Sequence, residues 1–357
     1  MSLVPTLTEL PPARSAAAYA THAQARLDAN AWNYVEASAG DGRTRQANRD
    51  AWDAMTLWPR VLQPLGGLDL TVELLGRTWP TPLLVAPMAL QKLVHADGEL
   101  ATVLAAAAQG VGMVLSTQTS MPMQQVSQAV RDDVTRGPLW FQLYMQGGRA
   151  ATLRLVRQAE AAGYEAIVLT VDASFRAPHA AFRLPAGVAA VHLPPPAHHD
   201  AGGLLAAAPT WDDVAWLLSE TTLPLLLKGV LHPEDAREAV RSGVQGLIVS
   251  NHGGRNLDTA IASATALRAV ADAVGGTLPL LVDGGLQRGT DVLKALALGA
   301  SAVLIGRPVL HGLGTAGAAG AAHVLRLLRD ELAIAMAQCG IRRPAAASRG
   351  LLAPESP

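Results

Sequence analysis

The chain has 357 residues, of which 50% are hydrophobic, and a formal net charge of −1 at pH 7. A chain this long buries about three quarters of the surface that its unfolded form exposes, which excludes a small disulfide-stapled module and a disordered tail protein. The near-neutral charge without a polybasic run argues against nucleic acid or a membrane surface as partner and favours a small molecule.

The N-terminal part predicts a helical extension over residues 1–80. Residues 1–15 lack a basic stretch followed by an apolar one, so we expect no secretory signal. Residues 14–55 are alanine-rich with Trp32, Tyr34 and Trp52 interleaved, a pattern typical of two or three packed helices. The single cysteine, Cys339, permits no internal disulfide and favours a reducing compartment, which we expect to be the cytoplasm.

Beyond residue 80, short apolar runs alternate with longer segments rich in alanine and leucine. Nearly continuous apolar runs are typical of strands that are buried on both faces. The alternation predicts one α/β domain over residues 81–341, a (β/α)8 TIM barrel, rather than a doubly wound sheet. The runs are 83–87, 112–116, 139–144, 165–172, 224–229, 246–251, 279–285 and 302–308.

Capping residues mark the ends of the helices between these runs. Thr210 and Pro233 are each followed closely by two acidic residues, which is typical of a helix start. Glycines that precede a strand are expected to end helices with a positive φ angle. They are Gly110, Gly163, Gly243 and Gly299.

Three other stretches have distinct expectations. The apolar stretch 100–116 is shorter than the roughly 20 residues of a membrane-spanning helix, so it predicts a buried helix running into a buried strand. Residues 174–208, with three consecutive prolines, show no regular period and are expected to form a lid or binding loop, or to be disordered. Residues 342–357 are expected to be a flexible tail.

Polar side chains gather at the carboxyl ends of the predicted strands, although only 16% of the residues are charged. These ends carry the functional groups of a (β/α)8 barrel, and core packing does not explain polar residues there. The residues at these strand ends, polar and apolar together and in chain order, are Pro87, Met88, Ala89, Ser116, Gln142, Tyr144, Thr170, Asp172, Lys228, Ser250, Asn251, His252, Gly253, Gly254, Arg255, Asp283, Gly284, Gly285, Gly306 and Arg307.

The last two strand ends indicate a phosphate site. A glycine pair after a strand is by itself about as often a structural turn as a binding loop. Here Gly284 and Gly285 lie beside the neighbouring Gly306–Arg307 pair, and barrels commonly hold a phosphate at this place. We therefore expect backbone N–H groups and an arginine to hold a phosphate.

The stretch SNHGGRNLD, residues 250–258, resembles the signature of the FMN-dependent α-hydroxy acid oxidases and dehydrogenases, the family of glycolate oxidase, lactate oxidase and mandelate dehydrogenase. The resemblance implies bound FMN, oxidation of an L-2-hydroxy acid to the 2-oxo acid, electron transfer to O2 or another acceptor, and a homotetramer. Further matching segments are Tyr34, PMALQK (87–92), FQLY (141–144), LTVD (169–172), LKG (227–229), DGG (283–285) and IGRP (305–308).

The resemblance also implies residue roles. His252 takes the substrate proton, and Asp172 orients and stabilises its imidazolium. Arg255 binds the substrate carboxylate, together with Tyr34 and Tyr144. Lys228 stabilises the reduced flavin. The implied flavin-binding residues are Pro87, Met88, Ala89, Ser116, Gln142, Thr170, Lys228, Ser250, Asp283, Gly284, Gly285, Arg288, Gly306 and Arg307.

Structural alternatives exist for these residues. From the residue types alone, a lone histidine such as His252 is more often a satisfied structural residue than a catalytic one. Asp172 is compatible with a turn cap, and packing in the helical extension is the more frequent role for a residue such as Tyr34. Lys228 is already unusual, because lysine is almost never buried unpaired. We expect no metal site, because His192, His198, His199 and Asp200 follow no ligand spacing.

Two positions depart from the family pattern. After the fourth strand, where members carry an arginine pair, this chain reads SFRAPHAAFRLP (174–185), and Arg176 is expected to bind the carboxylate, with His179 and Arg183 as alternatives. After the seventh strand, Gln287 stands where members place an arginine, so that Arg288 or Arg307 must supply the charge for the phosphate.

Two other functions remain open from the sequence. One is an FMN-barrel isomerase of the isopentenyl diphosphate type, and the other is a flavin-binding barrel without turnover. Ala89 and Gln118 are implied to line the substrate pocket. Gln118 stands where some members carry a bulky aromatic residue, which favours a larger 2-hydroxy acid over glycolate.

Overall fold

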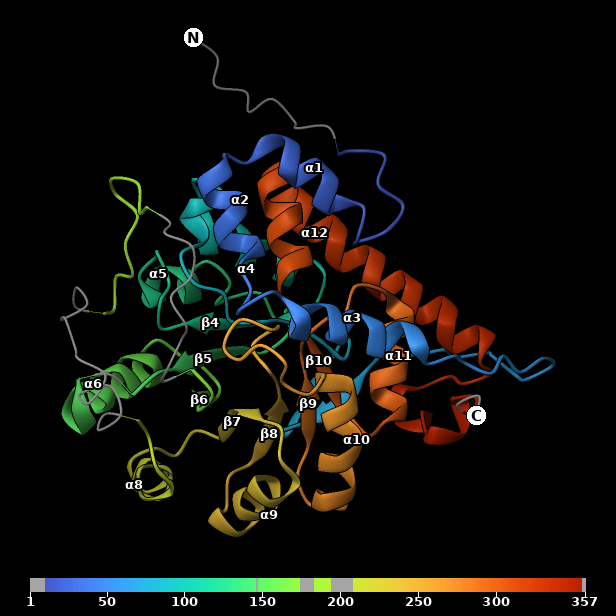
Figure 1. Cartoon of the computed structure of the whole chain (residues 1–357). Helices are drawn as coiled ribbons and strands as arrows, with labels where there is room; N and C mark the ends of the chain where they lie inside the picture. The colour runs from blue at the N-terminus through green and yellow to red at the C-terminus, as the bar shows by residue number, and fades with distance from the viewer. Residues whose placement is uncertain (1–9, 146, 174–182, 194–207, 355–357) are drawn as a thin grey trace.

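The computed structural model describes residues 10–145, 147–173, 183–193 and 208–354. Its centre is a closed barrel of parallel strands in the order β10-β3-β4-β5-β6-β7-β8-β9 (Figure 1). Each strand coincides with a predicted apolar run, with β7 extending one residue beyond its run, which confirms the (β/α)8 barrel. The strands are β3 (Leu83–Val85), β4 (Gly112–Ser116), β5 (Leu139–Leu143), β6 (Ile167–Thr170), β7 (Leu225–Val230), β8 (Gly246–Val249), β9 (Leu280–Val282) and β10 (Ala302–Ile305).

Alternating residues of each strand point into the barrel and toward the helices. Leu84, Trp140 and Leu226 belong to the apolar cluster inside the barrel, whereas Leu83 and Val85 pack with the helices outside it. The same alternation points the next inward residues, at the carboxyl end of the strands, into the barrel. This polar layer consists of Ser116, Gln142, Thr170, Lys228, Ser250 and Asp283.

Helices surround the barrel and begin and end as predicted. Thr210 forms a capping box at the start of α8, and Pro233 opens α9. The four predicted capping glycines have φ angles of 64°, 82°, 83° and 109°. No helix of the described residues is long and apolar enough to cross a membrane. The helices are α4 (Gly98–Ala108), α5 (Met123–Gln128), α6 (Gly148–Ala161), α8 (Trp211–Glu220), α9 (Pro233–Ser242), α10 (Ser263–Val274), α11 (Gly289–Ala297) and α12 (Arg307–Gln338), with a short 3-10 helix η1 (Gln91–Leu93).

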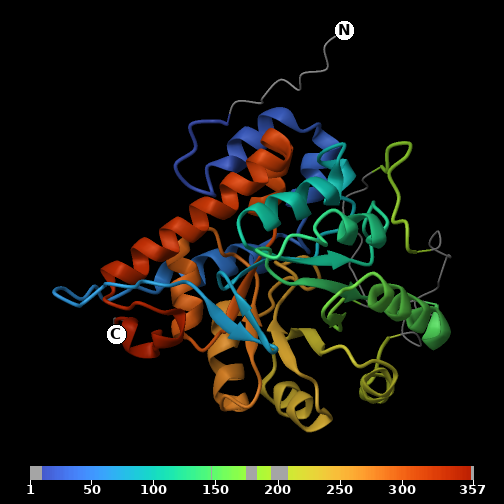
Figure 2. The same cartoon turned by 180° about the vertical axis from the view of Figure 1, so that it is seen from behind.

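The N-terminal extension consists of three helices and a hairpin. Helices α1 (Tyr19–Arg26), α2 (Ala29–Glu36) and α3 (Arg43–Ala54) lie across one side of the barrel together with α12 (Figure 1). The antiparallel pair β1 (Val72–Leu74) and β2 (Arg77–Trp79), visible from behind in Figure 2, was not predicted. Trp79 contributes to the inner cluster and packs edge-on against Trp140, with ring centroids 5.2 Å apart.

The chain from residue 342 to 354 differs from the flexible tail that we expected. It forms two short 3-10 helices, η2 (Pro344–Ala346) and η3 (Arg349–Leu351), and Leu351 is 6% exposed. The carbonyl of Leu351 accepts a hydrogen bond from the Trp58 amide at 2.8 Å. A partner far away in the sequence therefore orders this segment, and a local composition pattern cannot reveal such a partner.

Two glycines allow helix α12 to fold closely on itself. The helix is interrupted at Ala316 and Gly317, and a Cβ atom on Gly320 would lie 2.1 Å from the carbonyl oxygen of Gly312. We expect Gly320→Ala to lower the free energy of unfolding by about 1–3 kcal/mol through overpacking, as measured by urea denaturation. Gly66→Ala is the control, since no atom lies within 4 Å of its added Cβ. Equal stability of the two variants would contradict this packing argument.

Candidate active site

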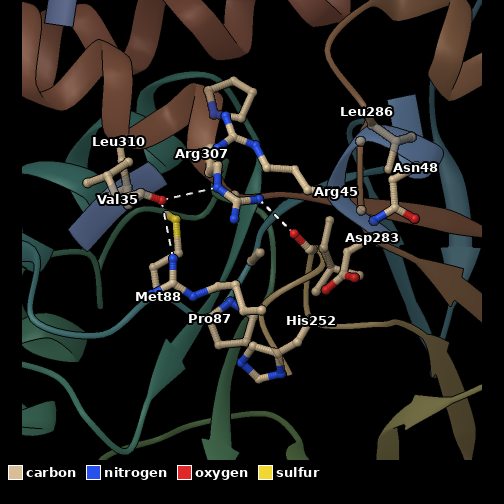
Figure 3. A pocket seen from close by; sticks show the side chains of 18 of the residues that line it. Val35, Arg45, Asn48, Pro87, Met88, His252, Asp283, Leu286, Arg307 and Leu310 are labelled. Carbon is tan, nitrogen blue, oxygen red and sulfur yellow. Dashed lines mark hydrogen bonds between the residues drawn. The ribbon is translucent and has the colours of Figure 1, made fainter. Parts of the chain in front are cut away.

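A cavity of about 310 Å³ opens at the carboxyl end of the barrel (Figure 3). It is lined by side chains from the strand ends and from the N-terminal extension, as expected for a barrel enzyme. Most of the predicted site residues meet there: Tyr34, Pro87, Met88, Ala89, Ser116, Gln118, Tyr144, Lys228, His252, Arg255, Asp283, Gly284, Gly285, Gly306 and Arg307.

Lys228 is a buried cation on the floor of this cavity. Its side chain is 3% exposed, and its Nζ lies 3.0 Å from Oδ2 of Asp283 and donates to Oγ of Ser250 at 2.8 Å. Burial alone would lower the pKa of Lys228, but the charges of Asp283 and Asp172 outweigh burial and raise it. The lysine therefore holds a fixed positive charge inside the barrel.

His252 is placed over the cavity by an unusual backbone. Its φ angle is 57°, in the left-handed region, where a residue other than glycine costs about 1–2 kcal/mol. Its amide donates to Oγ of Ser250 at 3.0 Å, and its Nδ1 lies 3.2 Å from Oδ1 of Asp172. Burial would raise the pKa of Asp172, but His252 and Lys228 lower it, so this residue is an anion. Asp172 does not line the cavity, whereas the imidazole that it contacts does.

Several polar atoms of the polar layer lack a hydrogen-bond partner among the described residues. Among the described residues, Nε2 of Gln142, Oγ1 of Thr170 and Oδ1 of Asp283 are buried without a hydrogen bond. A buried unsatisfied polar group costs about 1–3 kcal/mol. Gln142, Thr170 and Ser250 do not themselves line the cavity, but they lie in the layer that forms its floor. The arrangement fits a ligand that carries both hydrogen-bond donors and acceptors.

The last turn of α2 brings two arginines together. The final carbonyls of a helix lack intrahelical partners and carry the negative end of its dipole. Here Arg255 donates to the carbonyl of Tyr34 at 3.0 Å and lies over its ring, 5.3 Å from the centroid. Arg307 donates to the carbonyl of Val35 at 3.1 Å, as Figure 3 shows, and to the carbonyl of Ala37 at 2.8 Å. Tyr34 thus reaches the cavity, although it lies in the helical extension.

Other lining residues were missed by the sequence analysis, and several of them come from α2 and α3. Helix α3 packs directly on the loops after β8 and β9, since a Cβ on Gly254 would lie 2.6 Å from the amide of Arg45 and one on Gly285 would lie 2.7 Å from the carbonyl of Asn48. These glycines therefore make room for α3, a reason different from the predicted approach of a phosphate. No local signal separates a pocket arginine from a solvated one on such a polar helix. The missed residues include Glu36, Arg45, Asn48, Arg49 and His311.

The structure does not bring Arg288 to the cavity. It precedes α11, and its half-exposed guanidinium pairs with Asp53 at 2.5 Å. Since Arg288 does not line the cavity, its predicted place at the phosphate is corrected. The physical reason is that Asp53, on the adjacent helix α3, offers this arginine a carboxylate at the surface.

Other predicted residues lie in or near the loop after β6. Arg176, His179, His198, His199 and Asp200 fall outside the described residues. The amide of Arg183 donates to Oδ1 of Asn30 at 2.8 Å. Nε2 of His192 accepts from the amide of Met123 at 3.0 Å, so this histidine has a structural contact. Within the described parts of the chain, no group of three His, Cys, Asp or Glu side chains could hold a metal ion.

Comparison with known proteins gives a consistent result. Residues 23–354 match the family described as FMN-dependent dehydrogenase. The chain is 46% identical over 334 residues to the L-lactate oxidase of Roseobacter sp., covering 89% of each chain, and 40% identical over 355 residues to glycolate oxidase 1 of Zea mays, covering 95% of each. A solved structure of mandelate oxidase with (S)-2-phenylpropionate is similar with a TM-score of 0.88 and 38% identity, covering 96% of this chain and 98% of the other.

Proposed function

We propose, because the chain belongs to the family of FMN-dependent dehydrogenases, that it oxidises an L-2-hydroxy acid to the 2-oxo acid in this cavity. Relatives named as oxidases support O2 as the electron acceptor, with hydrogen peroxide as its product. The observation that carries the proposal is that His252, paired with Asp172 behind it, lines the same cavity as the buried Lys228. The presence of His252 and Arg255 in the same cavity argues against an isomerase.

The residues of the cavity fit FMN. The amide of Gln142 and the hydroxyl of Thr170, which lack hydrogen-bond partners among the described residues, suit the polar edge of a flavin ring. The fixed positive charge of Lys228 suits an electron-rich flavin ring. Arg307 suits its phosphate. We propose that Pro87, Met88, Ala89, Ser116, Gln142, Thr170, Lys228, Ser250, Asp283, Gly284, Gly285, Gly306 and Arg307 hold the cofactor.

Each residue near the substrate has a defined task. Bound FMN supplies the acceptor for the α-hydrogen and its two electrons. Nδ1 of His252 faces Asp172, so Nε2 is the nitrogen that takes the proton of the substrate hydroxyl, and the carboxylate stabilises the resulting imidazolium. Arg255 binds the substrate carboxylate in concert with Tyr34 and Tyr144, because a planar guanidinium matches a carboxylate.

Further parts of the proposal concern the substrate loop and the whole protein. Arg176 is proposed as a second carboxylate ligand. The helical extension 1–80 completes the site of the barrel domain 81–341 by contributing Tyr34. A cytoplasmic location is supported by the single buried Cys339, and a homotetramer by the family resemblance.

Anaerobic mixing of the FMN-loaded protein with glycolate, L-lactate and (S)-mandelate tests this function. We expect at least one of these acids to bleach the flavin absorbance, and the D-enantiomer of a chiral one to leave the absorbance unchanged. Air should then restore the flavin colour and produce one hydrogen peroxide per flavin. Bound flavin that no 2-hydroxy acid reduces would instead support a barrel without turnover or an isomerase. A reduced flavin that air does not reoxidise would identify a dehydrogenase.

A further inference from the structure

The phosphate end of the cavity lacks the arginine that the family pattern places after β9. Gln287 occupies that position and lines the cavity with a neutral amide. Arg288 pairs with Asp53 outside the cavity. An arginine from α3, Arg45, lines the cavity instead, and its charge acts on Arg307.

We propose that Arg45 binds the phosphate of FMN together with Arg307, in place of the arginine that Gln287 replaces. The inference rests on the proposed binding of FMN and names a ligand residue from the helical extension. In the view of Figure 3 the side chains of Arg45 and Arg307 are drawn next to each other, on the opposite side from His252, and the charge of Arg45 lowers the pKa of Arg307.

The backbone around Arg45 fixes its position. The close contact of Gly254 with the Arg45 amide holds the start of α3 against the loop after β8. The carbonyl of Gly253, in the same loop, accepts a hydrogen bond from Nη1 of Arg307 at 2.9 Å. The two arginines are therefore anchored to adjacent residues of one loop.

Glu36 holds the side chain of Arg45 in place. Nη1 of Arg45 donates to the Glu36 carbonyl at 2.7 Å, and its other terminal nitrogen pairs with the Glu36 carboxylate. The second carboxylate oxygen lies 2.9 Å from Nε2 of His311, whose ring stacks on Trp32. Burial would raise the pKa of Glu36, but His311, Arg45 and Arg307 lower it to about 2. The carboxylate is thus ionised, and it orients Arg45 from the side.

The cavity has an excess of positively charged side chains, which favours the binding of an anion. Among its described lining residues, five side chains are cationic and two are acidic, whereas the whole chain has a net charge of −1. Burial first, and then repulsion by Arg255 and Arg45, lower the pKa of Arg307 to about 9. The guanidinium of Arg307 is buried, so the positive charges of Arg255 and Arg45 destabilise it until an anion neutralises them, and a phosphate dianion does so.

The other cations are less suited to this task. Arg49 pairs with Asp53 and Asp291 at 2.8 and 2.7 Å, and Lys228 pairs with Asp283. Arg45 shares its single carboxylate with His311. Of these three cations, Arg45 therefore retains the most capacity to pair with a further anion.

Binding to the apoprotein tests the proposal without relying on catalysis. Flavin fluorescence titrations compare FMN with riboflavin, which lacks the phosphate. We expect Arg45→Leu to raise the dissociation constant for FMN by about 10- to 100-fold and to leave that for riboflavin unchanged, since one charge-assisted contact is lost. Arg45→Lys, which keeps the charge and loses the planar fork, should raise the FMN value by less.

Matched variants complete the test. Arg288→Leu removes an arginine that does not line the cavity and should change neither constant. Adding Gln287→Arg to Arg45→Leu should restore FMN binding. Equal weakening of FMN and riboflavin, or no weakening in either Arg45 variant, would show that Arg45 only ties α2 to α3 and would overturn the inference. A wild-type protein that binds neither flavin would instead contradict the proposed function.

Discussion

Replacing His252 with asparagine is expected to lower the rate constant of flavin reduction by a 2-hydroxy acid by about 10²–10⁴-fold, the usual contribution of a general base. Asparagine tolerates the left-handed backbone of this position, where φ is 57°, but its amide cannot accept the proton. The variant therefore removes the chemistry and preserves the loop. Anaerobic stopped-flow spectroscopy of the FMN-loaded variant measures the rate constant directly.

Two controls test whether the lower rate of flavin reduction is caused by the loss of the imidazole. His232→Ala changes an exposed histidine that caps α9 outside the cavity, so it should leave the rate constant unchanged. The FMN content of His252→Asn should equal that of the wild type. If the variant with normal FMN content is reduced at the wild-type rate, His252 is not the base and a structural role for it is the better interpretation.

The sequence predicts the barrel because its signals are local. An apolar run such as 246–251 marks a strand that is buried on both faces. Because side chains alternate along a strand, every second residue points into the barrel, and the last of these inward residues lie at the carboxyl rim of the barrel. His252 and Lys228 could therefore be placed in the site from strand periodicity alone. The short strands of the β1–β2 hairpin hold too few residues for a period to be detected.

The residues that the sequence did not predict reach the site through distant packing. Arg45 lines the cavity because α3 packs against Gly254 and Gly285, which lie more than two hundred positions later in the chain. The exposed position of Arg288 likewise depends on Asp53 of that helix. A pattern within one window of sequence contains neither contact, so the sequence predicted Arg288 in the site and did not predict Arg45.

Replacing Lys228 with methionine is expected to lower the free energy of unfolding of the apoprotein by about 3–5 kcal/mol, because it leaves a buried carboxylate without its cation. Oδ2 of Asp283 lies 3.0 Å from Nζ of Lys228, and Oδ1 of the same carboxylate has no partner among the described residues. Methionine fills most of the volume of the lysine stem, so the loss reports on charge more than on packing. Urea denaturation followed by tryptophan fluorescence measures it.

The neighbouring groups separate this electrostatic cost from other causes. Lys294 is also buried, but its Nζ donates to the carbonyl of Trp52 at 2.7 Å, so Lys294→Met leaves no carboxylate unpaired and should cost less. Adding Asp283→Leu to Lys228→Met should recover part of the loss, since both charges are then absent. If the double variant is less stable than Lys228→Met, packing rather than the unpaired Asp283 accounts for the effect. Recovery of stability without recovery of flavin reduction would show that the barrel keeps this charged pair for its chemistry, at the expense of its stability.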